Sequence, residues 1–557
     1  MCGIWVYVED KKIYTNEELY REFMNMNSRG PDHSSFQEFG AGTFVGFHRL
    51  AIMDPSPLSN QPFVLELPNN EVAVFVCNGE IYNYAELNER YNLGMTRHSD
   101  CLVIPLLYKA MGSDYAKFVQ LFQTEVRGEF SFVMTFFNTT TNEITNMIVG
   151  RDHIGVRPLY YGTHRNSIIF SSEIKSCNLF RGNLLEFPPG TIQKVMFTDS
   201  THYCIEISYV EWVSNVLPVK KTHDKYLEDV RTAVASSVLR RLHSDSPMGF
   251  LLSGGLDSSL VCAVASRLIG SGRSLRTFCC GMEGGTDLLY ARKVSEFLET
   301  DHTEVIFTAN EALEAINDVI YTVETWDTTT IRASVGQYLL AKYISQHTNI
   351  KTVMVGEGPD EVCSSYLFNW YAPSAEQLHY AAVESVKDLH KYDIKRVDRC
   401  LAAFGLEARV PYLDTDFIQA YWQIPAEDRV PQAYGCEKWW LRKSFDPVDE
   451  PPFLPPEVLW RKKEAFSDGI SPTYNSWFQI IQKHIQDNYG MTEEEYYTHS
   501  FVEMFGKNRL KIIEKPWQPK WNKDGTPVTS YVDPSARTLD VYDKLSSVPS
   551  STSLIDL

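Results

Sequence analysis

Two rhythms of apolar and polar positions divide the chain at a boundary between about residues 200 and 222. Before the boundary, short apolar runs typical of strands are separated by turn residues. The strand-like runs are Ile4–Val8, Thr43–Ile52, Val72–Val76, Phe130–Phe137, Ile144–Val149 and Ser167–Phe170, with helical patterns at Glu17–Met26 and Cys101–Met111. This mixture predicts stacked β-sheets covered by helices, an αββα sandwich of the α+β class.

After about Val216 the rhythm changes to alternating helices and strands. Tyr226–Leu242 places its apolar residues on one helical face. The elements that follow are Met248–Leu252, Ser259–Leu268, Thr277–Gly281, Leu288–Leu298, Thr303–Phe307, Glu311–Val323 and Lys351–Val355. Their alternation predicts βαβ units and a doubly wound parallel sheet of the α/β class, and residues 373–445 look mostly helical.

These patterns predict the domain organisation. We expect a first domain over residues 1–205, a linker over 206–222, a second domain over 223–545 and a disordered Ser-rich tail over 546–557. A chain of 557 residues is too long for one ordinary domain, so a division into two large units is reasonable.

Composition and charge narrow the possible partners. The net charge of -19 argues against nucleic acid as the main partner, because binding to a phosphate backbone needs clustered Lys and Arg. The 11 cysteines form no CxxC pair and no zinc-type spacing, which favours a reduced, cytoplasmic protein. No apolar stretch approaches the roughly 20 residues of a membrane span, and Glu9–Lys12 interrupts any signal-peptide core, so we expect no membrane partner.

The clearest chemistry is the stretch FLLSGGLDSS at residues 250–259, where a strand meets a helix. Its glycines allow a tight turn, and the unpaired N–H groups of the following helix favour an anion. Serine hydroxyls add donors, and Asp257 can hold Mg²⁺ against phosphates. The stretch has no GxxxxGK[ST] pattern, so it is not a Walker loop. A plain glycine turn with a serine cap is the alternative interpretation, which the whole run makes improbable.

The N-terminal stretch MCGIW carries a thiol directly after the initiator methionine. Cys2 could be a small apolar residue that begins a buried strand, or a nucleophile whose base is its own α-amine. An α-amine has a reference pKa of about 7.7–8.0, so it can serve once Met1 is removed. No histidine lies near Cys2 in the sequence.

Together these motifs resemble a known family. SGGLDSS is similar to the pyrophosphate loop of N-type ATP pyrophosphatases, and MCGIW resembles the class II, or Ntn-type, glutamine amidotransferases. Both, in this order, resemble glutamine-dependent asparagine synthetases over nearly the whole chain. The late stretches at 460–470 (WRKKEAFSDGI) and 533–539 (DPSARTL) resemble the eukaryotic branch. The resemblance implies a ligase of asparagine biosynthesis that uses ATP with Mg²⁺, L-aspartate and L-glutamine, needs no organic prosthetic group and forms a possible homodimer.

The resemblance implies a glutaminase site in the first domain. Cys2 would attack the amide, Asn78 and Gly79 would form the oxyanion hole, Arg49 would bind the α-carboxylate and Asp100 the α-amine. The full glutamine pocket implied is Arg49, Leu50, Ala51, Ile52, Met53, Asn78, Gly79, Glu80 and Asp100. Alone, Arg49 could be a salt-bridge partner, Asn78-Gly79 a hairpin turn and Asp100 a helix cap.

The resemblance also implies an adenylating site in the second domain. Glu357 is the catalytic acid or base, and Lys463, or its neighbour Lys462, stabilises pyrophosphate charge. Thr329 and Arg332 would lie near the phosphate and aspartate, and Asp257 and Asp360 would hold Mg²⁺. The ATP-binding set implied is Leu251, Ser253, Gly254, Gly255, Asp257, Ser258, Ser259, Cys280, Val355 and Gly356. β-Aspartyl-AMP would form there and react with ammonia delivered through an internal tunnel.

The chain departs from the family pattern in several places. The loop usually written GEGSDE is GEGPDE here, and Pro359 removes a backbone donor and restricts Gly358. Residues 363–366 (CSSY) replace a stretch with more glycine, Val355 replaces a serine, and EVRG at 125–128 replaces an LDG-type turn.

Three functions are compatible with these residues. The first is glutamine-hydrolysing asparagine synthesis, and the second is a related adenylating amidotransferase with another carboxylate substrate. The third is a catalytically impaired protein that binds ATP or glutamine, which Pro359 alone supports.

Overall fold

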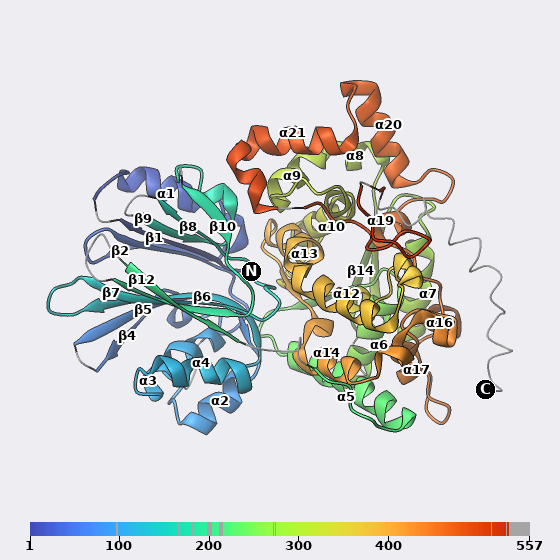
Figure 1. The fold of residues 1–557 in the computed structure, drawn as a ribbon, viewed down its shortest axis with the longest axis horizontal. Helices are drawn as coiled ribbons and strands as arrows, with labels where there is room; N and C mark the ends of the chain where they lie inside the picture. The colour runs from blue at the N-terminus through green and yellow to red at the C-terminus, as the bar shows by residue number, and fades with distance from the viewer. Residues whose placement is uncertain are drawn as a thin grey trace.

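The computed structural model describes residues 1–9, 11–68, 70–95, 99–164, 167–180, 182–197, 203–210, 216–270, 272, 274–513, 515–530 and 532–533. The predicted tail at 546–557 and the middle of the predicted linker lie outside these residues. Two units stand side by side in Figure 1, a sheet-rich one in blue and cyan and a helix-rich one in green to red.

The first unit is built on two six-stranded antiparallel sheets. One sheet has the order β10 (Asn183–Glu186), β8 (Tyr160–His164), β9 (Ser167–Ser171), β1 (Gly3–Glu9), β3 (Thr43–Arg49) and β2 (His33–Phe39). The other has the order β12 (Tyr203–Tyr209), β11 (Thr191–Phe197), β7 (Ile144–Arg151), β6 (Gly128–Asn138), β5 (Glu71–Ile81) and β4 (Phe63–Leu67). Apolar side chains of both sheets, such as Val6, Phe47 and Val76, share one core between them.

Helices cover the outer faces of this sandwich (Figure 1). Helix α1 (Asn16–Met24) lies on one side, and its Thr15 cap and Glu18 form a reciprocal capping box. Helices α2 (Tyr84–Tyr91), α3 (Val103–Ala110) and α4 (Tyr115–Thr124) lie on the other side. The αββα sandwich is therefore confirmed. Strand β12 continues to Tyr209, past the predicted domain end at residue 205.

The second unit is built on a five-stranded parallel sheet with the order β15 (Asp301–Ile306), β14 (Arg276–Gly281), β13 (Met248–Leu251), β16 (Thr352–Met354) and β17 (Glu407–Arg409). The doubly wound α/β prediction is confirmed. The chain order reverses between β13 and β16, which is where open α/β sheets bind ligands at the carboxyl ends of their strands. Strand β17 lies inside the region that the sequence predicts to be mostly helical.

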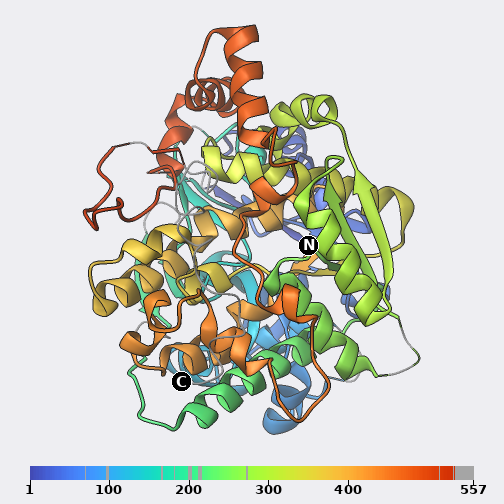
Figure 2. The same cartoon turned by 90° about the vertical axis from the view of Figure 1, so that its right-hand side faces the viewer.

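The helices of this unit follow the sequence pattern with local differences. Among them are α5 (His223–Arg241), α6 (Leu256–Ile269), α7 (Thr286–Leu298), α10 (Thr328–His347), α12 (Ala375–Asp388) and α13 (Asp393–Ala402). The single helix expected over Glu311–Val323 is two, α8 (Ala309–Glu314) and α9 (Ile316–Val323), separated at Ala315. Later helices include α17 (Trp439–Ser444), α20 (Trp477–Tyr489) and α21 (Glu493–Phe505). Figure 2 shows the parallel sheet in green and the red helices α20 and α21 above it.

Buried charges join the two units. Arg29 donates to Asp398 at 2.7 Å, Arg157 donates to the Ala408 carbonyl at 3.0 Å, and Arg409 pairs with Glu80 at 3.1 Å. All three arginines are fully buried or nearly so. Breaking one partner of such a pair is strongly destabilising, so the contact orients one domain firmly on the other.

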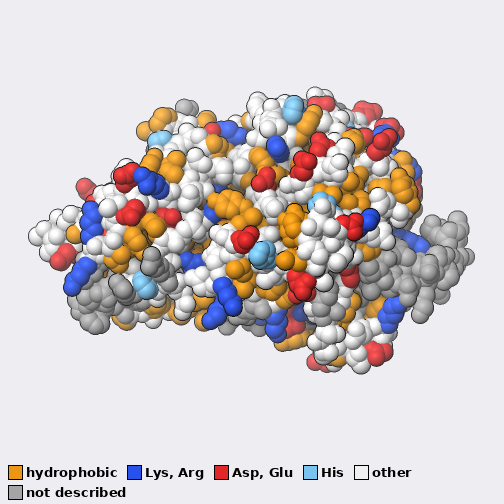
Figure 3. Space-filling model, turned by 90° about the horizontal axis from the view of Figure 1, so that it is seen from above, with side chains coloured by type: hydrophobic (Ala, Val, Ile, Leu, Met, Phe, Trp, Pro, Cys, Tyr) orange, Lys and Arg blue, Asp and Glu red, His pale blue; other side chains and the backbone are white. Residues whose placement is uncertain are grey.

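Acidic and basic side chains are interspersed on the face seen in Figure 3, without one extended basic stripe among the residues described there. Within the described parts of the chain, no helix combines the length and apolar character that crossing a membrane requires.

Candidate active sites

Cys2 lies directly before strand β1 and against the end of strand β3. The pairing of Gly3 with His48 brings the thiol to Leu50, whose N–H donates to Sγ at 3.4 Å. Burial raises the pKa of the Cys2 thiol to about 11. A thiol held in this state needs a nearby base before it can act as a nucleophile.

Asn78 and Gly79 lie within strand β5, paired with Ser131 and Phe130, and do not form a hairpin turn. The hairpin alternative is therefore wrong. A Cβ on Gly79 would lie 2.2 Å from the Glu129 carbonyl oxygen, so the close pairing with β6 requires glycine.

The two polar atoms of the Asn78 side chain have different surroundings. Its Oδ1 accepts a hydrogen bond from the Cys2 backbone N–H at 3.0 Å. Its Nδ2 is buried and has no hydrogen-bond partner among the described residues. A buried donor without a partner is costly and rare, which makes it a marker of a ligand position. Here the donor belongs to the same side chain that accepts the Cys2 backbone N–H.

Arg49 is not a surface salt-bridge partner. Its guanidinium donates to the carbonyl oxygens of Ser56 at 2.8 Å and Met53 at 3.3 Å, to that of Asp54, and to Asn60 Oδ1 at 2.7 Å. It thereby holds the loop after β3 in shape. In that loop Leu50, Ile52 and Met53 pack with Cys2 and Tyr84, and the Ala51 N–H donates to Asp32 at 2.6 Å.

Asp100 and Glu80 flank the same strand. Asp100 begins the short 3₁₀ helix Asp100–Leu102 and is not its N-cap residue, and its Oδ2 accepts the Ile81 N–H at 2.6 Å. Burial, together with nearby Glu407, raises the pKa of Asp100 to about 6. Glu80 points to Arg409 of the second domain. The structure thus gathers all the predicted glutamine-pocket residues around β3 and β5.

Met1 lies at the domain contact. Its amine donates to the Leu406 carbonyl at 3.3 Å, and its sulfur accepts a hydrogen bond from Arg157 at 2.6 Å. Burial lowers the pKa of this amine to about 5. With Met1 in place, the Cys2 nitrogen is an amide and cannot act as a base.

The SGGLDSS loop joins β13 to helix α6. Ser258 Oγ accepts the Ser253 N–H at 3.2 Å and lies 3.0 Å from Ser253 Oγ. Gly254 has φ +72°, and a Cβ there would lie 2.3 Å from the Ala291 nitrogen. The tight turn brings the start of α6, from Gly255 to Ser258, into the lining of a cavity, where the sequence predicts an anion.

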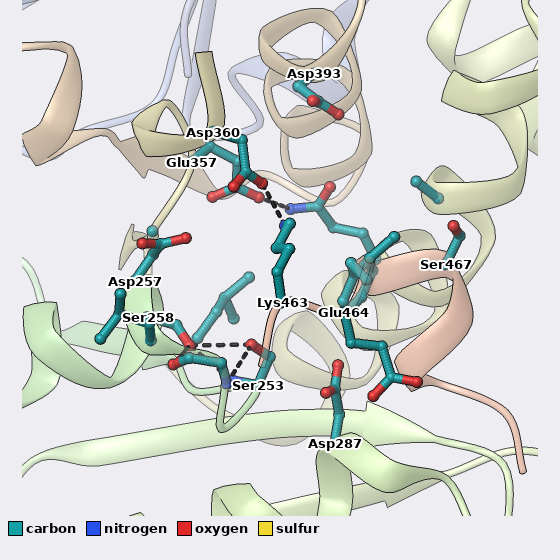
Figure 4. A pocket seen from close by; sticks show the side chains of 18 of the residues that line it. Ser253, Asp257, Ser258, Asp287, Glu357, Asp360, Asp393, Lys463, Glu464 and Ser467 are labelled. Carbon is teal, nitrogen blue, oxygen red and sulfur yellow. Dashed lines mark hydrogen bonds and ion pairs between the residues drawn. The ribbon is translucent and has the colours of Figure 1, made fainter. Parts of the chain in front are cut away.

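This cavity has a volume of about 210 Å³ and lies at the carboxyl ends of β13 and β16. Predicted site residues that line it are Leu251, Ser253, Gly255, Asp257, Ser258, Cys280, Thr329, Gly356, Glu357, Asp360 and Lys463. Gly254, Ser259 and Val355 lie next to these residues in the chain but outside the lining. Figure 4 shows the acidic residues, the serines and Lys463 converging on it.

Arg332 is also outside the lining, and its charge is engaged elsewhere. Arg332 is buried, and its guanidinium is held by Glu493 at 2.5 Å and Asp533 at 3.0 Å. It does not belong to the lining. The phosphate-side role that the resemblance implies for Arg332 has no support from its position.

A lysine that the sequence does not reveal joins the two predicted metal carboxylates. Lys438 Nζ donates to Asp257 at 2.5 Å and Asp360 at 2.6 Å, and Lys463 donates to Asp360 at 2.5 Å. Burial by itself raises the pKa of Asp360, but Lys438 and Lys463 hold it well below its usual range. Burial also raises the pKa of Asp257, and Lys438 opposes that shift. No motif around Lys438 signals this position.

Two buried polar atoms of the cavity lining, Asp257 Oδ1 and Thr329 Oγ1, have no partner among the described residues, and neither has Ser259 Oγ, next to the lining in the chain. Mg²⁺ in nucleotide sites is usually held by one or two carboxylates plus phosphate oxygens and water. Asp257 and Asp360 supply two such carboxylates, and the unpartnered Asp257 Oδ1 is an oxygen that could coordinate the ion. The residues present therefore fit a phosphate-bound Mg²⁺.

The GEGPDE loop fits its proline. Gly358 has φ +108°, and Pro359 takes the first position of helix α11 (Pro359–Val362). Proline is well tolerated there because the N–H it lacks makes no intrahelical bond. What Pro359 removes is one donor at a helix N-terminus. Nearby, Ser364 has φ +53°, a conformation that glycine adopts at lower cost.

The other end of the cavity is lined by acids and an arginine. Arg396 lies 3.4 Å from Glu357 Oε1 and 2.9 Å from Asp393. Burial raises the pKa of Glu357, and Arg396 opposes this shift. Figure 4 shows Asp393 far from Ser253 and Asp287, which mark the opposite end. Nothing in the local sequence singles out Asp393 or Arg396.

Comparisons with known proteins agree with this arrangement. The family model described as asparagine synthase matches residues 229–379 and 369–529, and the model for a glutamine amidotransferase domain matches residues 1–209. The chain is 35% identical to the asparagine synthetase [glutamine-hydrolyzing] of Asparagus officinalis, over 100% of this chain and 95% of the relative. It is 34% identical to the protein of the same name from Cricetulus griseus, over 97% of this chain and 99% of the relative.

A solved structure of glutamine phosphoribosylpyrophosphate amidotransferase from B. subtilis is also similar, at 13% identity. The match covers 72% of this chain and 96% of the other, with a TM-score of 0.33.

Proposed function

The chain belongs to the asparagine synthetase family, and from this premise we propose that it is a glutamine-hydrolysing asparagine synthetase. The reaction converts ATP, L-aspartate, L-glutamine and water to AMP, pyrophosphate, L-asparagine and L-glutamate. One observation supports it best: the chain holds Cys2 through its backbone N–H on a side chain, Asn78, that keeps an unpartnered amide donor, and it has a separate cavity at a phosphate-type loop.

In the first domain, Cys2 attacks the side-chain amide of glutamine. The negative charge on the amide oxygen is stabilised by Asn78 Nδ2 and the Gly79 N–H. Removal of Met1 frees the Cys2 amine as the base, and it returns the proton to the departing ammonia. Water then hydrolyses the thioester and releases glutamate. Arg49 and Asp100 bind the α-carboxylate and α-amine.

In the second domain, the β-carboxylate of aspartate attacks the α-phosphorus of ATP. Pyrophosphate leaves, and β-aspartyl-AMP forms. Lys463 and Lys438 stabilise charge on the departing pyrophosphate. When bound, Mg²⁺ supplies charge neutralisation at the phosphates, and Asp257 and Asp360 are the residues that would hold it. Ammonia then attacks the acyl carbon, and Glu357 accepts its proton as AMP leaves.

The domain contact supports a route for ammonia. Strand β17 lies between Met1, whose amine meets the Leu406 carbonyl, and strand β16, which leads to Glu357. The Val355 N–H donates to the Arg409 carbonyl at 3.1 Å. We place the internal passage along this contact, where loss of Met1 frees volume next to Cys2.

The experiment uses purified protein from which Met1 has been removed, as verified by mass spectrometry. It is incubated with aspartate, ATP and Mg²⁺, and with either glutamine or ammonia. Equal amounts of asparagine, AMP and pyrophosphate from both nitrogen donors are expected. Pyrophosphate without asparagine would instead favour another carboxylate substrate, and ATP binding without pyrophosphate release would favour an impaired protein.

A further inference from the structure

The chain after its last helices crosses the acid-lined end of the synthetase cavity. Trp517 lines the cavity together with Tyr366, Asp393 and Glu361. In Figures 1 and 2 the dark red end of the described chain runs as a loop beside helix α12, and Lys520 pairs there with Glu384 at 3.3 Å. This segment, residues 515–530 with 532–533, is called the C-terminal strap below.

Trp517 is fixed through its backbone to the helix that carries Thr329. The Trp517 N–H donates to Asp327 Oδ1 at 2.6 Å. Asp327 is fully buried and caps helix α10, where its Oδ2 accepts the Thr330 N–H at 2.8 Å. One carboxylate therefore sets the position of the strap and of the first turn of α10 together.

The Trp517 ring also supports the acids of the cavity. It packs at 5.4 Å from the Tyr366 ring and 5.9 Å from the Phe368 ring. The Tyr366 hydroxyl lies 2.5 Å from Glu361 Oε1 and 3.1 Å from Asp393 Oδ2. Since one hydroxyl proton serves two carboxylates, a shift of Tyr366 would change how both are presented to the cavity.

Arg332 fastens the other end of the strap. Its Nε and Nη2 donate to Glu493 at 2.8 and 2.5 Å, and its Nη1 and Nη2 donate to Asp533 at 3.0 Å each. Gln482 donates to the same Asp533 at 2.9 Å. The planar guanidinium is thus engaged by two carboxylates in the forked geometry that arginine favours.

The position of Trp517 indicates which substrate it meets. The loop at Ser253 and Asp257 takes phosphates, and Leu251, Phe278 and Leu340 supply apolar surface for a nucleoside. The remaining end offers Arg396 for a carboxylate and Asp393 for an ammonium group, which is the pattern that an amino acid requires.

We propose that the C-terminal strap is a wall of the synthetase site, with Trp517 closing the end that binds aspartate. In the same proposal, Arg332 is a positioning residue that fastens the strap through Asp533 and does not touch substrate. The inference rests on the proposed function, because it assigns one subsite of that reaction.

The test measures ammonia-dependent asparagine formation, with KM for aspartate and KM for ATP determined separately. We expect Trp517→Ala to raise KM for aspartate by about tenfold or more, with KM for ATP changed by less than about twofold. Trp517→Phe, which keeps a ring, should recover most of the loss. Asp533→Asn and Arg332→Lys should raise the same KM for aspartate, since each loosens the forked pair.

Lys520→Ala is the matched control, because it removes a surface ion pair of the same segment and should leave both KM values unchanged. Glutaminase activity of every variant reports folding. If Trp517→Ala fails to fold, Asp533→Asn and Arg332→Lys still decide the matter, because both are expected to raise KM for aspartate.

An unchanged KM for aspartate in Trp517→Ala and Asp533→Asn would overturn the proposal. So would Arg332→Lys that raises KM for ATP and spares KM for aspartate, since that result would assign Arg332 to the phosphates. Failure of the unsubstituted protein to form asparagine is a separate outcome, which would overturn the proposed function itself.

Discussion

The two sites of this molecule are built in opposite ways. The proposed glutaminase site gathers Cys2, Arg49, Asn78 and Asp100 around strands β3 and β5 from within one hundred residues of chain. Its Asn78 Nδ2 donor is buried and unpartnered among the described residues. The synthetase site gathers groups from residue 251 to residue 517, and its Lys438 and Lys463 are paired with Asp257 and Asp360.

The two sites differ in how much they must reorganise when their substrates bind. In the proposed mechanism, glutamine meets a donor, Asn78 Nδ2, that is already buried and unpartnered among the described residues, so little has to reorganise. ATP meets carboxylates and lysines that neutralise one another, so its phosphates must draw the lysines from their internal partners. We therefore expect activity at the first site to depend on single donor or acceptor atoms, and activity at the second site to depend on the balance between its lysines and carboxylates.

The largest expected effect separates the two sites completely. Cys2→Ala should lower glutamine-dependent asparagine formation by about 10³-fold or more, because it removes the nucleophile. Ammonia-dependent formation should stay within about twofold. Asparagine is measured with each nitrogen donor, and Cys204→Ala, at an exposed thiol, is the control. Full glutamine-dependent activity without Cys2 would return that residue to an ordinary strand position.

Lys463→Ala should act on the opposite site. Loss of the cation should lower pyrophosphate release by about 10²–10³-fold while glutaminase activity is kept. Lys462→Ala, which changes the neighbouring lysine of the same lining, should have a much smaller effect. If the Lys462 variant lost more activity than the Lys463 variant, the assignment of the two lysines would be reversed.

Asn78→Asp tests the single unpartnered donor. The new side chain can still accept the Cys2 N–H but cannot donate to an oxyanion, so kcat for glutamine hydrolysis should fall by about 10²-fold. KM for glutamine should change far less. A loss confined to KM would mean that the side chain binds glutamine and does not stabilise the transition state.

The pH dependence of glutamine hydrolysis should reveal Asp100. Because burial raises the pKa of Asp100 to about 6, its carboxylate is protonated below that pH and no longer attracts the α-ammonium group. KM for glutamine should therefore rise as the pH falls below about 6, by about tenfold per pH unit, and level off above it. Steady-state glutaminase assays from pH 5 to 8 measure this. A flat KM across that range would contradict the role.

The smallest expected effect concerns the departure from the family loop. Pro359→Ser restores a donor at the start of helix α11 and should change KM for ATP by less than about threefold, because the proline fits its position without strain. The free energy of unfolding should fall by about 0.4–1 kcal/mol, since the unfolded chain regains freedom. A large gain in synthesis would show that the proline impairs this enzyme.

The sequence predicts the fold well where one pattern decides the element. The apolar run Ile4–Val8 becomes β1, and the alternation after residue 216 becomes the parallel sheet. Strand β17 escapes prediction because it has only three residues, Glu407–Arg409, all of them buried. Two of them, Glu407 and Arg409, carry charged side chains that pair across the domain contact. The Asn78-Gly79 hairpin signal is overridden by tertiary pairing with β6.

The candidate sites divide in the same way. Residues of the proposed glutaminase site can be predicted because each sits in a short local motif of the sequence. Lys438 cannot, since its two carboxylate partners lie at residues 257 and 360 and nothing beside it in the chain indicates them. Arg332 shows the converse: a motif identifies it, but partners at residues 493 and 533 decide where its charge is used.

The burial of Met1 has a consequence for the order of events during biosynthesis. Once the domains have docked, Met1 is fully enclosed, with its amine on the Leu406 carbonyl. An aminopeptidase can reach it only before residue 406 has emerged and folded. At ~5–20 residues per second, that interval lasts about 20–80 s. In the proposed mechanism, a chain that kept Met1 would lack the free Cys2 amine, and we expect it to retain only ammonia-dependent synthesis.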